Sequence, residues 1–153
     1  MTNDQRVVLV RHNSYLFKGT VEENLKMAKP DATKEEMEAV LQKVNLLGFL
    51  QTQDGLQTQL LEKASNLSGG QCQRLVIARA LLRTDSAVYI FDEAASNIDV
   101  ESEELIMNVI HELAKTKTVL LISHRLANVV KSDKIYFLSL IHISEPTRLA
   151  LIS

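Results

Sequence analysis

The sequence predicts an α/β fold in which a parallel sheet stands beside a helical subdomain. Residues 7–10, 87–91 and 118–122 are apolar runs of strand length, and continuous apolar runs are typical of strands buried on both faces of a parallel sheet. Helical patterns alternate with these runs, as expected when crossover helices connect parallel strands. Residues 20–50 contain mainly helical patterns, so we expect them, together with the region around residues 66–74, to form a helical subdomain beside the sheet, and the remaining residues to form the core.

Composition fits one globular domain and excludes some classes of protein. The chain has 153 residues, of which 46% are hydrophobic and 24% charged. A net charge of −2 gives no basic surface for nucleic acid, so we expect no nucleic-acid partner. The single cysteine, Cys72, excludes an internal disulfide and favours a reducing compartment, and we expect a small buried side chain there. No apolar run approaches the roughly 20 residues that span a bilayer.

Two capping boxes mark helix starts in the predicted subdomain. Thr20 and Glu23 have the required spacing and predict the start of a short helix. Thr33 and Glu36 repeat that spacing ahead of apolar residues at helical intervals, which predicts an amphipathic helix over residues 34–45.

The remaining elements follow from composition and breaks. Residues 51–66 are polar and irregular, so we expect a loop there. A helix is expected to start at 68–70 and to be largely buried, because residues 75–82 are nearly all apolar and lack Gly and Pro. An amphipathic helix over 101–115 and a short final strand at 134–137 complete the prediction.

The end of the sequence has a different character. Residues 138–148 read LSLIHISEPTR, which resembles the translated end of a transposon-based sequencing adapter. We therefore expect residues 138–153 to be a non-native tail and residues 1–137 to be the natural sequence, continuing past Phe137 in the native protein. The alternative is a natural amphipathic tail.

The most informative motif is LSGGQ, formed by Leu67, Ser68, Gly69, Gly70 and Gln71. Two glycines let a backbone approach a ligand closely, and a helix starting there directs free N–H groups and a positive dipole end outward, which suits a phosphate. Ser68 can add a hydroxyl donor. A serine N-cap followed by a Gly-Gly turn is the alternative explanation.

Two acids follow the second predicted strand. Asp92 and Glu93 come directly after residues 87–91, which places their carboxylates at the carboxyl edge of the sheet, where α/β proteins bind ligands. Acids at a strand end are also common without any function.

Taken together, these motifs resemble those of ABC ATPases. Residues 66–74 (NLSGGQCQR) resemble the signature motif, and the acid pair about twenty residues later resembles the Walker B motif. The resemblance covers about residues 7–137 and implies a P-loop NTPase-like sheet with a helical subdomain. It also implies that Asp92 holds Mg²⁺, that Glu93 is the general base for the attacking water, and that the LSGGQ residues contact ATP.

Three further positions fit the family order. Residues 95–99 resemble the D-loop, with Asp99 at its acidic position, and residues 123–125 resemble the switch region, which implies that His124 contacts the γ-phosphate. His12 stands where the family usually has the glutamine of the Q-loop. A neutral imidazole could accept a hydrogen bond from metal-bound water, whereas a protonated one would oppose Mg²⁺.

The implied function is ATP hydrolysis that powers membrane export. In this family two nucleotide-binding domains pair head to tail, so we expect a second such domain, in a homo- or heterodimer, as a partner. The stretch 15–25 (YLFKGTVEENL) resembles exporters whose transmembrane domain is fused upstream, which implies work at the cytoplasmic face of the cell membrane.

Other readings remain open. One alternative is an ABC-type ATPase of DNA repair or chromosome structure, which would need heptad arms. A second is a soluble translation-type ATPase. His12 suggests a third, a degenerate regulatory half with weak hydrolysis. No G-x-x-x-x-G-K-[ST] phosphate loop occurs in the chain. We expect that loop and its strand to precede Met1, so the predicted domain is incomplete and this chain alone inactive.

Overall fold

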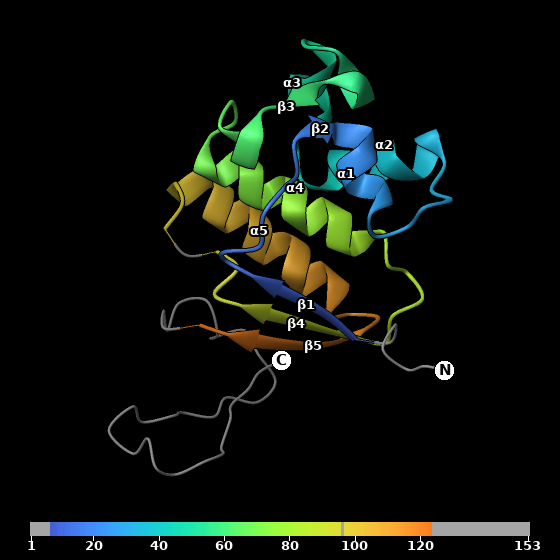
Figure 1. The fold of residues 1–153 in the computed structure, drawn as a ribbon. Coiled ribbons are helices and arrows are strands. Elements are labelled where there is room, and N and C mark those ends of the chain that lie inside the picture. The colour runs from blue at the N-terminus through green and yellow to red at the C-terminus, as the bar shows by residue number, and fades with distance from the viewer. Residues whose placement is uncertain (1–6, 96, 124–153) are drawn as a thin grey trace.

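The predicted parallel sheet is present, and in the part of the chain that the structure describes it contains three strands, which appear as neighbouring arrows in Figure 1. The structure is a computed structural model that describes residues 7–95 and 97–123. Strands β1 (Val7–Arg11), β4 (Val88–Asp92) and β5 (Thr118–Ile122) pair in parallel in the order β1-β4-β5. The α/β prediction is therefore confirmed, with each of these strand boundaries correct to within one residue.

Two predicted features lie outside the described residues. These are the strand expected at 134–137 and the tail expected at 138–153. Within the described part of the chain, no helix is long and apolar enough to cross a membrane.

The strand register gathers the carboxyl ends of the three strands at one edge of the sheet. Arg11 pairs with Asp92, and Asp92 pairs on its other side with Ile122. Because ligands of parallel α/β sheets bind beyond this edge, Asp92 lies where a ligand site is expected.

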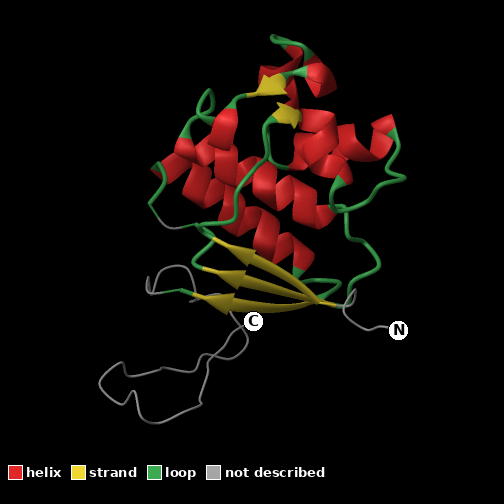
Figure 2. Cartoon of the chain, in the orientation of Figure 1, coloured by secondary structure: helices red, strands yellow, loops and turns green. Residues whose placement is uncertain are grey.

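Burial alternates along β1, because the described helices pack on one face of the sheet. Two helices lie over that face in Figures 1 and 2: α4 (Gly69–Leu81) and α5 (Val100–Leu113). Val8 and Val10 are buried beneath them, whereas Val7 and Leu9 keep 46% and 48% of their surface exposed. The expectation that this strand is buried on both faces is therefore wrong for the described residues.

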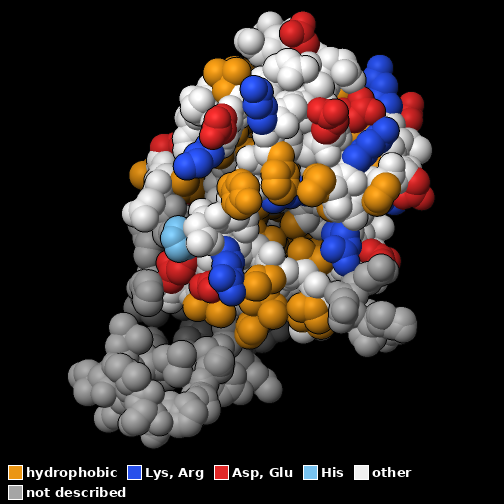
Figure 3. All heavy atoms as spheres, viewed as in Figure 1, with side chains coloured by type: hydrophobic (Ala, Val, Ile, Leu, Met, Phe, Trp, Pro, Cys, Tyr) orange, Lys and Arg blue, Asp and Glu red, His pale blue; other side chains and the backbone are white. Residues whose placement is uncertain are grey.

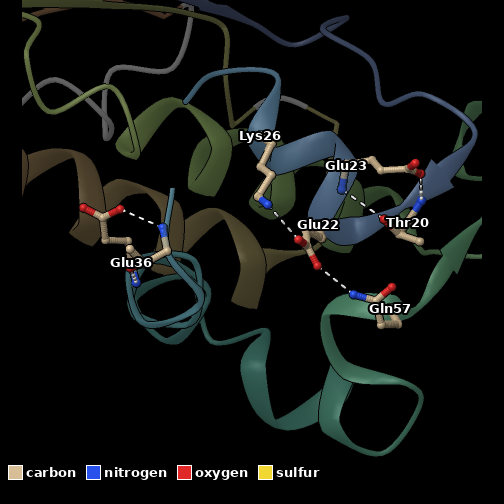
Figure 4. A network of polar contacts seen from close by, with 7 residues as sticks. Thr20, Glu22, Glu23, Lys26, Glu36 and Gln57 are labelled. Atoms are coloured by element: carbon tan, nitrogen blue, oxygen red, sulfur yellow. Dashed lines mark hydrogen bonds and ion pairs between the residues drawn. The ribbon is translucent and has the colours of Figure 1, made fainter. Parts of the chain in front are cut away.

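The segment that we expect to belong to a helical subdomain contains helices α1 (Val21–Lys26), α2 (Lys34–Lys43) and α3 (Leu47–Gln51). Both predicted capping boxes are formed, as Figure 4 shows at Thr20, Glu23 and Glu36. Helix α2 ends two residues earlier than predicted, because Asn45 adopts a left-handed φ of 56° and turns the chain.

The prediction of an irregular loop at residues 51–66 is wrong in part, because the segment contains a strand and two short helices. A short strand, β3 (Gln59–Leu60), pairs antiparallel with β2 (Gly19–Thr20). Two single-turn helices flank β3: η2 (Gly55–Gln57) and η3 (Glu62–Ala64). Asn66 closes the segment by accepting from Leu61 N–H at 2.9 Å and donating to the Gln59 carbonyl at 3.0 Å.

A polar network joins α1 to η2 on the surface. Glu22 pairs with Lys26 at 2.9 Å and accepts from Gln57 Nε2 at 2.6 Å, as Figure 4 shows. Lys26, and then Gln57, lower the pKa of Glu22. Because both charged side chains are partly exposed, solvent screens the pair and its contribution to stability is small.

The core lies between the sheet and α4–α5 and continues into the subdomain. Tyr89 and Phe91 of β4 and Leu75 and Ile77 of α4 are fully buried. Of the apolar face predicted for α5, only Ile106 and Ile110 are buried. The rest of that face is half-buried, because the helix instead turns three other residues inward: Ser102, Glu103 and Met107.

Candidate functional site

The start of α4 is organised by the serine and glutamine of the LSGGQ motif. Ser68 Oγ accepts a hydrogen bond from Gln71 N–H at 3.0 Å, and Gln71 Oε1 accepts one from Ser68 N–H at 2.9 Å. This reciprocal pair is a capping box, which satisfies two of the free N–H groups of the helix start. Leu67 is half-buried and packs against the core, whereas Ser68 and Gly69 are exposed. The motif is therefore held against the core by Leu67, while Ser68 and Gly69 face solvent.

The two glycines have different surroundings. A Cβ added at Gly70 would collide with Asp99 Oδ1 and Ser102 Oγ and would lie 2.9 Å from Ser102 Cβ. A Cβ added at Gly69 would meet nothing within 4 Å. Close packing of α4 on the start of α5 therefore requires a glycine at Gly70, while nothing within the described residues requires one at Gly69.

Asp99 lies beside this motif and caps α5. Its Oδ2 accepts a hydrogen bond from Ser102 N–H at 2.8 Å. That backbone N–H, and then the Ser102 hydroxyl, hold the pKa of Asp99 below its ordinary value. The starts of two helices meet here, and both bring positive dipole ends to one corner of the molecule. Among the described site residues outside the LSGGQ motif, the fold thus brings Asp99 to Gly70.

The acid pair occupies the end of the central strand. Asp92 is the last residue of β4, and Glu93 follows with a φ of +57°. Glu93 N–H donates to the Ile122 carbonyl at 2.9 Å, which fixes this turn against the end of β5. A left-handed conformation is uncommon for a non-glycine residue and stores strain, which is found most often at functional sites. Both acids are half-buried at the carboxyl edge of the sheet.

His12 reaches the same edge through its main chain. His12 N–H donates to the Asp92 carbonyl at 3.2 Å, while its side chain is exposed. His124 lies outside the described residues. Within those residues no three His, Cys, Asp or Glu side chains form a metal cluster. A Mg²⁺ ion fits Asp92 even so, because Mg²⁺ commonly takes one or two carboxylates and completes its shell with water and phosphate oxygens.

Polar side chains of α4 that the sequence analysis missed connect this site to the rest of the chain. Gln73 is buried and donates to the Arg11 carbonyl at 3.4 Å. Arg79 donates to the Tyr15 carbonyl at 3.2 Å. The usable signal was their presence in a helix that is otherwise mostly apolar.

A groove lies between α4, β1 and the loop that follows β1, with a volume of about 460 Å³. Tyr15, Phe17 and Met27 line it and are exposed, and the two aromatic rings lie 5.3 Å apart. Figure 3 shows hydrophobic side chains gathered around a hollow on this face of the molecule. Exposed apolar groups collected in this way are typical of an interaction surface.

Comparison with known proteins gives a consistent result. A family model described as "ABC transporter" matches residues 2–96. A Haemophilus influenzae protein described as an uncharacterized ABC transporter ATP-binding protein is 57% identical over 129 residues, covering 84% of this chain and 23% of that protein. The ATP-dependent lipid A-core flippase of Vibrio vulnificus is 43% identical over 129 residues, covering 83% and 22%. The chain thus spans about a quarter of the length of the curated relatives it matches.

Among solved structures, a bacterial Atm1-family ABC exporter with ATP bound superimposes with a TM-score of 0.76 at 29% identity. The match covers 84% of this chain and 23% of the exporter. The observed sheet and helices therefore have the fold of the corresponding part of that protein.

Proposed function

Because this chain belongs to the ABC transporter family, we propose that it is the later part of a nucleotide-binding domain that hydrolyses ATP to power membrane export. The observation that carries the proposal is the acid pair at the end of β4. Glu93 is held there in a left-handed conformation by a main-chain hydrogen bond to Ile122. A carboxylate fixed at a sheet edge can accept a proton from an attacking water.

The two acids would have separate roles. Asp92 would hold Mg²⁺ with water and phosphate oxygens, and Glu93 would orient and deprotonate the water. When bound, Mg²⁺ would neutralise charge on the phosphates. The proposed role of His124, contact with the γ-phosphate, rests on the family resemblance alone.

The LSGGQ residues would serve a nucleotide held by a second domain. Ser68 and Gly69 are exposed at the start of a 13-residue helix, so they can meet a ligand from outside the chain. Gly70 and Asp99 would support that surface from behind. Such an arrangement suits a head-to-tail pair of domains, in which binding of ATP closes the pair and hydrolysis reopens it.

The export function is proposed from the relatives and from one surface. The relatives are about four times as long as the matched region, which leaves room for a transmembrane domain. The groove beside Tyr15, Phe17 and Met27 offers exposed apolar contacts to that domain. Docking there would place this chain at the cytoplasmic face of the cell membrane.

A second candidate function is a regulatory half with weak hydrolysis. His12 favours it, because an imidazole stands where the family usually supplies a glutamine. Its exposed side chain lets His12→Gln be made without disturbing the core, and a large gain in turnover from that change would support this candidate.

The deciding experiment measures ATP hydrolysis by the full-length protein and by its Glu93→Gln variant. We expect turnover to fall by roughly 10²–10⁴-fold with ATP binding retained, because the general base is lost and the strand end is not. Glu104→Gln, an exposed acid on α5, is the matched control and should keep full activity. An unchanged rate of ATP hydrolysis in the Glu93→Gln protein would exclude the proposed catalytic role of Glu93.

A further inference from the structure

The loop between β1 and β2, residues 12–18, is positioned largely by side chains from two helices. Asn24 of α1 donates to the Phe17 carbonyl at 2.9 Å and accepts from Phe17 N–H at 2.7 Å. Arg79 of α4 donates to the Tyr15 carbonyl at 3.2 Å. One end of the loop is therefore fixed to α1 and its middle to α4.

Two side chains of α4 donate hydrogen bonds to this part of the chain, and the two bonds differ in length and in the charge of the donor. Gln73 reaches the Arg11 carbonyl at 3.4 Å, which is long for a hydrogen bond. The Arg79 contact is shorter and comes from a charged donor, and charged donors form the stronger bonds. Arg79 is thus the main polar link from α4 to the loop.

The surroundings of Arg79 give it no other evident role. Its guanidinium is half-buried, and no carboxylate within the described ranges forms an ion pair with it. Burial lowers the pKa of Arg79, because the charged form loses contact with water. A methionine of similar length would fill the space without that desolvation cost. What only the arginine supplies is the hydrogen bond to Tyr15.

We infer that Arg79 is a positioning residue that fixes the 12–18 loop to α4, so that the loop moves with the helix that begins at the LSGGQ motif. The functional consequence of this contact, described next, rests on the proposed function. The loop carries His12 next to Asp92 at one end and exposed Tyr15 and Phe17 at the other. Arg79 thereby links the nucleotide side of the helix to the groove.

The test is amide hydrogen exchange of the full-length protein, compared with Arg79→Met and Arg79→Lys. We expect the amide of Ser14, which donates to the Arg11 carbonyl, to exchange at least tenfold faster in Arg79→Met, with partial rescue by lysine. The amide of Phe17, which Asn24 of α1 holds, should change less. The unfolding temperature should stay the same or rise. Lys26→Met, which removes a partly exposed cation from α1, should leave the loop unchanged.

Two results would overturn the inference. One is unchanged exchange of the loop in a folded Arg79→Met protein. The other is a lower unfolding temperature with faster exchange throughout α4, which would make Arg79 a general stabilising residue. If Arg79→Met does not fold, the same comparison is made with Arg79→Gln, which removes the charge and shortens the side chain, and unchanged loop exchange in that variant also overturns the inference.

A second arm separates this inference from the proposed function. Mg·ATP is added to Glu93→Gln protein with and without Arg79→Met. We expect ATP to slow exchange of residues 12–18 only when Arg79 is present, and equal protection in both proteins would contradict the link. Absence of ATP protection in both would count against the proposed function, while exchange without ATP would still decide the role of Arg79.

Discussion

Gly69 and Gly70 are neighbours in the LSGGQ motif, yet the fold uses them differently. Gly70 packs against Asp99 and Ser102, so Gly70→Ala should lower the free energy of unfolding by about 1–3 kcal/mol, the usual range for overpacking. The methyl group of Gly69→Ala would meet no atom within 4 Å, so this variant should change the free energy of unfolding by less than about 0.5 kcal/mol. Denaturant titration of both variants checks the difference. Equal losses at the two positions would mean that helix packing does not explain Gly70.

The same pair separates stability from catalysis in the full-length protein. Gly69→Ala is expected to reduce ATP turnover by roughly tenfold or more, since a methyl group would displace a ligand that approaches the backbone closely. Its unfolding temperature should match that of the natural protein. A Gly69→Ala protein with full turnover would show that no ligand approaches this glycine closely.

Cys72 tests the local environment of the motif. Its Sγ lies 3.6 Å from the Ala64 carbonyl, and burial raises the pKa of the thiol. A smaller thiolate fraction near pH 8 predicts alkylation by iodoacetamide several-fold slower than in the same protein unfolded in guanidinium. Equal rates in the two states would show that this thiol is not shielded.

At the scale of elements, the sequence was most informative where the deciding interactions are local. The capping boxes at Thr20 and Thr33 were readable because both partners lie within four residues. The pairing of β2 with β3 could not be predicted, because Gly19 and Leu60 are distant in sequence and become neighbours only in the tertiary fold. The inward face of α5 was predicted in part, because burial there is set by where α4 and the sheet lie.

Lowering the pH should destabilise helix α2, whose capping box includes Glu36. Lys29, and then Thr33 N–H, hold the pKa of Glu36 below its ordinary value of about 4.3. The folded state therefore gains stability from the ionised form above that range and loses it as the pH falls through the lowered pKa. We expect Glu36→Gln to flatten the fall in unfolding temperature between roughly pH 5 and pH 3.

The control for that prediction is Glu35→Gln, an exposed acid one position earlier on α2. Glutamine at position 36 keeps the capping geometry, so any change reports on charge and not on the cap. Identical pH profiles for the natural protein and Glu36→Gln would contradict the assignment.

On the scale of the whole molecule, the sheet leaves one apolar face without a described cover. Leu9 keeps 48% of its surface exposed on that face, so the 153-residue chain should self-associate. Leu9→Lys is expected to reduce association several-fold in sedimentation velocity while changing stability by less than about 0.5 kcal/mol. Val10→Lys, at a position only 2% exposed, should instead prevent folding. Undiminished association of Leu9→Lys would show that another surface is responsible.

The candidate site was predicted residue by residue, but its arrangement was not. Motif spacing located the acid pair and the glycines, because those patterns are local in sequence. The contacts of Asp99 with Gly70 and of His12 with Asp92 depend on how α5 and β1 are placed, which no local pattern records. The hydrogen bond of Arg79 to the Tyr15 carbonyl was missed for the same reason.

The strand order carries a consequence for how the chain is made. Strands β4 and β5 are separated only by α5 and short turns, whereas residues 12–87 lie between β1 and its neighbour β4. Pairs that are distant in sequence close slowly, so β4, α5 and β5 should assemble first and β1 should join last. The ribosome nevertheless delivers β1 before the other two strands. The valines and leucine of β1 are therefore exposed to water for the longest time during synthesis. A chaperone would be most useful in that interval.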